Sequence, residues 1–135
     1  MLYVDSNIFI YPIIYDSEAM PEAARAKAKL NEITSGSLKA FTSTLTWDEV
    51  TWVTRRLFGP EKAAKQGASL LRLPNLRLLS VDLETISRAQ TLLERHDLKP
   101  RDAIHAATAI RSGISKILSY DEDFDTLPNL VRVIP

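Results

Sequence analysis

Short apolar runs rich in β-formers alternate along the chain with longer stretches of helical periodicity. This alternation is typical of βα units and predicts a mostly parallel sheet whose strands are buried on both faces. We therefore expect an α/β fold, a three-layer sandwich with a central, mostly parallel sheet of four to five short strands flanked by helices. The expected strands span Leu2–Val4, Ala40–Ser43, Leu76–Val81, Lys116–Ser119 and Leu130–Ile134.

Proline, glycine and capping residues mark the expected helix ends. Thr46 and Glu49 have the spacing of a capping box, in which each side chain satisfies a free backbone N–H at a helix start. A single interior glycine, Gly67, should cost its helix about 1 kcal/mol relative to alanine. The expected helices span Pro21–Thr34, Thr46–Phe58, Pro60 to the residue before Pro74, Leu83–His96 and Arg101–Arg111.

The length of 135 residues suits one compact unit, so we expect a single domain over residues 1–135, without repeats or linkers. Seventeen basic side chains balance seventeen acidic ones, which means that any nucleic-acid binding must come from a local patch. Zero cysteines and two histidines argue against a zinc site and fit a reducing compartment, so we expect a cytoplasmic protein. No apolar run is long enough to span a bilayer, and the N-terminal segment lacks the features of a signal peptide.

Four carboxylates follow the expected strands or open the helices after them: Asp5, Glu49, Asp102 and Asp121. In an open parallel sheet the carboxyl ends of the strands converge on one edge, where ligands bind. Each acid also has a structural explanation, as a helix N-cap, a capping-box member, a first-turn acid favoured by the helix dipole, and a turn residue, respectively. The conjunction of four acids at one edge nevertheless favours a functional site.

Four such carboxylates would need a counter-charge. At an effective dielectric near 20, two like charges about 5 Å apart repel by about 3 kcal/mol, so four close acids hold on the order of 10–20 kcal/mol of repulsion. Either some protons stay bound or a cation occupies the centre. An all-oxygen site suits Mg²⁺ or Mn²⁺, and the chemistry it suggests is phosphodiester hydrolysis.

Other polar residues lie near these acids in the sequence. Ser6 and Asn7 beside Asp5, and Ser119 beside Asp121, are candidates for hydrogen bonds that orient carboxylates, or alternatively for helix initiation and strand termination. His105 lies three positions after Asp102, on a similar helix face, yet a buried, hydrogen-bonded imidazole is a more common role than a base.

The middle of the chain is locally basic. Such a patch could follow the phosphates of a nucleic acid, although solvated helix faces are the alternative. Two tryptophans flank Glu49; either could stack on a base or contact a partner, and core packing is the default for Trp52. The basic residues are Arg55, Arg56, Lys62, Lys65, Arg72 and Arg77, of which Arg55, Arg56 and Arg72 are the candidates for binding nucleic acid.

Four segments resemble, in order and approximate spacing, the signature blocks of PIN-domain ribonucleases, most closely the VapC-type toxins: Val4–Phe9 (VDSNIF), Thr46–Val50 (TWDEV), Pro100–Ala109 (PRDAIHAATA) and Ser119–Phe124 (SYDEDF). The resemblance extends over essentially the whole chain. It implies a PIN-like domain and a metal-dependent endoribonuclease with Mg²⁺ or Mn²⁺ at Asp5, Glu49, Asp102 and Asp121. Asp123 matches a position that is often acidic in the family and ranks below these four as a ligand.

The resemblance further implies an RNA substrate, a homodimer and a cognate antitoxin protein of a type II toxin–antitoxin pair. Aspartate-phosphorylating proteins also carry acids at strand ends, but dehalogenase-like phosphatases have Asp-x-Asp after the first strand, and here the second position is Asn7. Receiver domains need a paired acid near the first strand and a lysine after the fifth, and neither is evident. A module of the same fold that binds RNA or protein without cutting remains the non-enzymatic alternative.

Overall fold

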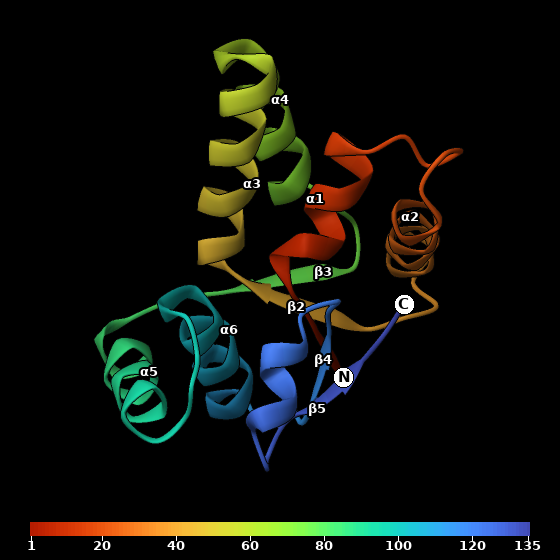
Figure 1. Ribbon diagram of the computed structural model, residues 1–135. Helices are drawn as coiled ribbons and strands as arrows, with labels where there is room; N and C mark the ends of the chain where they lie inside the picture. The colour runs from red at the N-terminus through yellow and green to blue at the C-terminus, as the bar shows by residue number, and fades with distance from the viewer.

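A computed structural model describes all 135 residues and contains one five-stranded sheet (Figure 1). Every neighbouring pair of strands is parallel, in the order β3-β2-β1-β4-β5. The predicted parallel sheet is therefore confirmed, with ends that differ by one or two residues in three strands. The strands are β1 (Leu2–Val4), β2 (Ala40–Ser43), β3 (Leu76–Leu79), β4 (Lys116–Leu118) and β5 (Val131–Val133).

Six α-helices and one 3₁₀ helix connect the strands. They are α1 (Ser6–Ile14), α2 (Pro21–Thr34), α3 (Thr44–Phe58), α4 (Pro60–Leu71), α5 (Leu83–Arg95), α6 (Pro100–Arg111) and η1 (Glu122–Thr126). The helices α1 and η1 were not expected from the sequence. In α1, Pro12 and a run of Ile, Phe and Tyr hide the helical period, and burial of Ile8 and Phe9 stabilises the helix instead.

The two faces of the sheet are covered by different helices, because successive side chains of a strand point to opposite faces. Tyr3 and Ile117 belong to the core cluster that includes α5, α6 and Phe124 of η1. Val4 and Leu118, their neighbours in sequence, belong to the cluster that includes α1, α2, α3 and α4. Figure 1 shows α3 and α4 rising together from one side of the sheet, while α5 and α6 lie on the other. The three-layer sandwich is confirmed.

The predicted capping box of α3 is wrong. The helix begins at Thr44, with Ser43 as its N-cap and no side-chain capping bond. The Thr46 hydroxyl bonds instead to Thr42 Oγ1 at 2.6 Å, and Thr42 Oγ1 donates to the Val4 carbonyl at 2.7 Å. Because Glu49 is thereby released from a capping role, its side chain is available to the sheet edge.

Gly67 lies where α4 packs against α3. A Cβ at this position would come within 2.8 Å of both Trp47 Nε1 and Thr51 Cγ2. The glycine therefore permits a close approach between the two helices, which offsets its cost in helix propensity. Trp52 was expected in the core and is instead 50% exposed. None of the helices is long and apolar enough to cross a membrane.

Candidate metal centre

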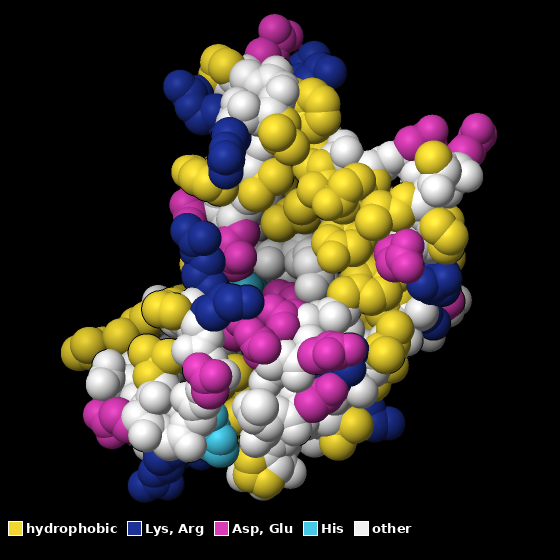
Figure 2. All heavy atoms as spheres, in the orientation of Figure 1, with side chains coloured by type: hydrophobic (Ala, Val, Ile, Leu, Met, Phe, Trp, Pro, Cys, Tyr) yellow, Lys and Arg dark blue, Asp and Glu magenta, His cyan; other side chains and the backbone are white.

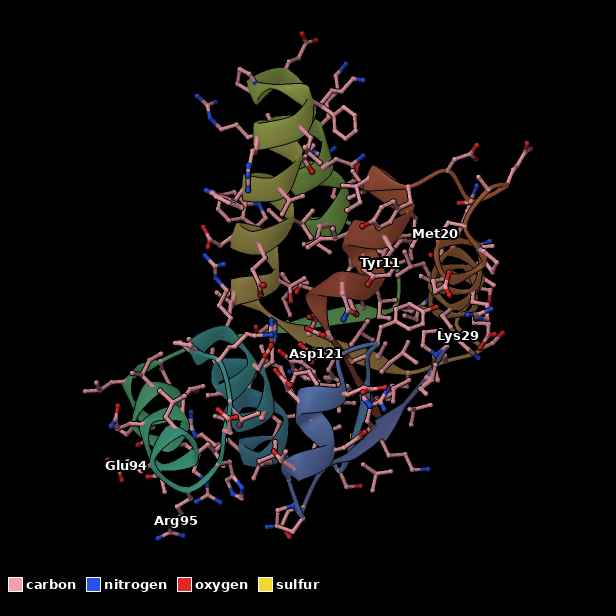
Figure 3. The ribbon with its side chains drawn as sticks, in the orientation of Figure 1. Tyr11, Met20, Lys29, Glu94, Arg95 and Asp121 are labelled. Carbon is pink, nitrogen blue, oxygen red and sulfur yellow. The ribbon has the colours of Figure 1, made fainter.

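The acids that follow β1 and β4 meet the first turn of α6 at one edge of the sheet. Oxygen atoms of Asp102, Asp121 and Asp123 all lie within 4.8 Å of one another. Asp121 is the N-cap of η1, and Asp123 lies in the first turn of that short helix. Figure 2 shows acidic side chains gathered in a hollow of the surface, and Figure 3 shows Asp121 where α1, α6 and η1 approach each other.

The Ser119 hydroxyl connects two of the predicted acids. Its Oγ donates to Asp5 Oδ2 at 2.6 Å and accepts from the backbone N–H of Asp121 at 2.9 Å. The Asn7 amide donates to the same Oγ at 3.1 Å, and the Ser6 backbone N–H donates to Asp5 Oδ1 at 2.7 Å. Asp5 is thus the N-cap of α1, and its carboxylate is also connected to Asp121 through Ser119. The capping role that was the structural alternative is therefore compatible with a role in a site.

Glu49 is held by a separate pair of contacts. Its Oε1 accepts from His105 Nε2 at 2.5 Å, and its Oε2 accepts from Ser6 Oγ at 3.1 Å. The other ring nitrogen of His105, Nδ1, bonds to the Tyr3 hydroxyl at 2.7 Å. Because both nitrogens are engaged and the side chain is 1% exposed, His105 is the buried, hydrogen-bonded imidazole that we expected and not a base facing substrate.

Burial and crowding of charge shift the acid–base properties of this edge. Burial, followed by the negative charges of Asp121 and Asp5, raises the pKa of Asp102 to about 7. Burial also raises the pKa of Asp5, although His105 opposes this shift. Burial lowers the pKa of His105, but the hydrogen bond to Glu49 and the charges of Asp5, Glu49 and Asp102 outweigh it and keep the pKa above its ordinary value. The acidic edge therefore favours bound protons or a cation.

Two acceptor oxygens here fit a cation better than a purely structural role. Asp102 Oδ2 is buried without a hydrogen-bond partner, and so is Asn7 Oδ1. Asp102 does not cap its helix, since α6 has Lys99 as N-cap and no side-chain capping bond. Buried acceptors without partners are costly in an ordinary fold. Oxygen donors of this kind suit Mg²⁺ or Mn²⁺, so the residues present fit such an ion.

The structure groups the acids differently from the ranking made on the sequence. Asp123, ranked below the other four, joins Asp102 and Asp121 in the close group, whereas Glu49 is engaged by His105 and Ser6. Sequence reasoning did not connect Tyr3 to His105, because the two residues are 102 positions apart. It also missed Lys99, whose Nζ lies 3.3 Å from Asp123 Oδ2.

The basic residues considered for RNA binding lie on the surface outside the carboxylate group. Arg55 and Arg56 are exposed on α3, and Arg72 is the exposed C-cap of α4. The Arg56 guanidinium lies 5.4 Å from the centre of the Trp52 ring. Figure 2 shows Lys and Arg side chains along α3 and at the border of the acidic hollow, so positive charge accompanies the edge where the acids gather.

Comparisons with known proteins agree with this architecture. The family model for the PIN domain matches residues 2–130. Three similar solved structures are a Mycobacterium tuberculosis toxin, VapC20, that cleaves the sarcin-ricin loop, and the VapBC complexes of Rickettsia felis and Salmonella typhimurium bound to DNA. Their identities are 21%, 16% and 16%, and their TM-scores 0.74, 0.72 and 0.70. The matches cover 96%, 99% and 98% of this chain, and 97%, 98% and 96% of the other chains. No curated protein sequence matches the chain.

Proposed function

We propose that this chain, which belongs to the PIN domain family, is a metal-dependent endoribonuclease that hydrolyses RNA phosphodiester bonds and is the toxin of a type II toxin–antitoxin pair. The observation that carries the proposal is the convergence of Asp102, Asp121 and Asp123 on one point, beside the buried Asp5. One of these acids, Asp102, keeps a buried oxygen without a partner. Glu49 is connected to this edge by the hydrogen bond that its Oε2 accepts from Ser6 Oγ.

Two groups of side chains would hold the divalent ion and orient the carboxylates that bind it. Asp5, Asp102, Asp121 and Glu49 are the proposed ligands of Mg²⁺ or Mn²⁺, with Asp123 beside them. Ser6, Asn7 and Ser119 fix carboxylate directions through the hydrogen bonds described above. When bound, a divalent ion would polarise a phosphoryl oxygen and lower the pKa of a coordinated water.

The names of the similar structures support the toxin assignment. One of them is a toxin that cleaves the sarcin-ricin loop, and two are complexes of VapB and VapC. The match to VapC20 covers nearly the full length of both chains. On this basis we assign RNA as the substrate, with Arg55, Arg56 and Arg72 contacting its phosphates. Such contacts weaken as salt rises, because phosphate binding releases counterions.

An apolar groove gives the proposed antitoxin a place to bind. The groove, of about 560 Å³, lies between α1, α2 and the α3–α4 pair. Its lining includes Phe9, Ile13, Leu30, Phe58 and Leu70. Phe58→Asp should weaken binding of a small protein encoded beside this chain, whereas Ile134→Asp, an exposed residue outside the groove, should not. Co-expression followed by affinity purification tests this, and equal binding by both variants would contradict the assignment.

Exposed apolar side chains on α3 and α5 support the proposed homodimer. Trp47 and Trp52 on α3 are 42% and 50% exposed, and Leu83 and Ile86 on α5 are 81% and 43% exposed. A contiguous apolar patch is typical of a protein–protein contact, and we propose that these four side chains contribute to one. Sedimentation equilibrium of the wild type and of Leu83→Glu tests this assignment; a monomeric wild type would contradict it.

RNA cleavage tests the proposed activity directly. Single-stranded and structured RNAs are incubated with the wild type in Mg²⁺, in Mn²⁺ and in chelator, and we expect cleavage only with metal. Asp102→Asn should abolish cleavage. Asp97→Asn, an exposed acid of the preceding loop, is the matched control and should cleave normally. Cleavage that survives chelator, or that survives Asp102→Asn, would contradict the proposal. RNA that is bound but left intact under every condition would favour the alternative of a non-catalytic binding module.

A further inference from the structure

A buried chain of hydrogen bonds connects the first strand to the acidic edge. It runs from the Tyr3 hydroxyl to His105 Nδ1 at 2.7 Å, and from His105 Nε2 to Glu49 Oε1 at 2.5 Å. Tyr3 and His105 are fully buried, and the Glu49 side chain is only 14% exposed. An ionised carboxylate only accepts hydrogen bonds, so the imidazole donates to Glu49 through Nε2–H.

This chain determines where the Glu49 carboxylate can point. Glutamate has a long side chain with considerable rotamer freedom, which must be lost if its oxygens are to serve a site. Here each oxygen has one partner, because His105 holds Oε1 and Ser6 holds Oε2. An ionised carboxylate has about four lone-pair positions, so this arrangement leaves two for another ligand.

A core histidine that only fills space would not need this arrangement. The His105 ring packs edge-on against Tyr3, with ring centres 5.8 Å apart, and Tyr3 itself follows Leu2 in the central strand. The imidazole also lies 3.7 Å from Asp5 Oδ1, so it touches two of the proposed ligands and no solvent. Nε2 of the ring thus faces Glu49 and Asp5 at the acidic edge, and Nδ1, on the other side of the ring, is held by the Tyr3 hydroxyl.

We propose that His105, anchored by the Tyr3 hydroxyl, is a positioning residue that sets the direction of the Glu49 carboxylate for divalent-ion binding. This role rests on the proposed function, and it adds Tyr3 and His105 to the acidic residues proposed as ligands. Residues that orient ligands in this way typically contribute 10- to 100-fold to metal affinity.

A matched pair of variants separates positioning from packing. The amide nitrogen of His105→Gln reaches as far along the side chain as Nε2 and can still donate to Glu49. The amide nitrogen of His105→Asn reaches only as far as Nδ1 and cannot form the hydrogen bond to Glu49. His105→Gln keeps the donor to Glu49 but loses the bond to Tyr3, so we expect it to weaken Mn²⁺ binding only several-fold, whereas His105→Asn should weaken it about 10- to 100-fold. Tyr3→Phe keeps the packing, removes the anchor and should weaken binding several-fold.

The measurement is a Mn²⁺ titration followed by electron paramagnetic resonance of the free ion, with circular dichroism in chelator to show that each variant is folded. Should His105→Asn fail to fold, the comparison rests on Tyr3→Phe. In a Glu49→Gln background the differences among the His105 and Tyr3 variants should shrink to twofold or less. In RNA cleavage, the positioning variants should lower kcat while leaving KM for RNA unchanged.

Two results would overturn the inference. Mn²⁺ affinity equal to the wild type in both folded His105→Asn and Tyr3→Phe would assign the chain of bonds to stability alone. Losses that persist undiminished in the Glu49→Gln background would show that His105 does not act through Glu49. A wild type that binds no Mn²⁺ at millimolar concentration would contradict the proposed function itself, which is a distinct outcome.

Discussion

Replacing Asp102 by asparagine should stabilise the protein when no metal is present. The carboxyl has a pKa of about 7 in the fold against 3.8 in an unperturbed chain, because burial and the charges of Asp121 and Asp5 disfavour ionisation. Each unit of pKa difference corresponds to about 1.4 kcal/mol, so the full shift corresponds to about 4 kcal/mol. Since the group is only half-buried, solvent screening reduces this to about 2 kcal/mol.

The sign of the effect follows from the raised pKa. Below about pH 4 the carboxyl is protonated in both the folded and the unfolded chain, so its raised pKa does not lower the free energy of unfolding. The lowering grows as the pH rises from about 4 to 7 and is fully present above that range. Asn cannot ionise, so Asp102→Asn should unfold about 6–10 °C higher than the wild type at pH 8, with a difference that shrinks toward pH 4.

Thermal unfolding followed by circular dichroism in chelator measures this shift, with Asp97→Asn as an exposed control that should not change. Saturating Mn²⁺ should reverse the order of stability, because ligand at 100 times its dissociation constant stabilises the native state by about 2.7 kcal/mol. A melting temperature of Asp102→Asn below that of the wild type in chelator at pH 8 would refute the reasoning. It would show that Asp102 serves the dipole of α6 instead.

Three further substitutions test the packing and the hydrogen bonds around the site. Gly67→Ala should lower the free energy of unfolding in urea by about 1 kcal/mol, because its Cβ meets Trp47 and Thr51 at 2.8 Å. The same change should be neutral or stabilising once Trp47 and Thr51 are both alanine, since both contacts are then removed and alanine is the better helix former. A stabilised single variant would contradict the close packing. Phe124→Ala should cost about 3–5 kcal/mol in the same assay, since the ring is fully buried, and a loss below 1 kcal/mol would contradict its place in the core. Ser119→Ala should cost about 2 kcal/mol in urea at neutral pH and weaken Mn²⁺ binding, because Asp5 loses a buried donor; unchanged stability would remove Ser119 from the site.

The fold was largely predictable because its signals are local and repeated. All five strands occur where apolar β-formers lie between helical segments, and the prolines at the starts of α2, α4 and α6 mark those helices correctly. The prediction failed where tertiary contacts outweigh local preference. The helix α1 has a β-like composition, and α3 begins two residues before the proposed capping box.

The candidate site was predictable as a location but less so in its details. Parallel strands bring their carboxyl ends together, and this rule gathered the acids without any knowledge of side-chain contacts. Which acids lie closest depends on the turn of η1, which places Asp123 beside Asp121, and no local pattern indicated that turn as a helix. The bond from Tyr3 to His105 joins distant segments through the core, so it required the three-dimensional structure.

The proposed metal centre is tested most directly by locating a divalent ion in a crystal of the wild type grown with Mn²⁺. Anomalous scattering at the manganese edge identifies the ion independently of the surrounding density. We expect an anomalous peak coordinated by Asp102 and Asp121, and no such peak in Asp102→Asn. A peak elsewhere on the molecule, or a fully ordered acidic edge without any ion at saturating Mn²⁺, would contradict it.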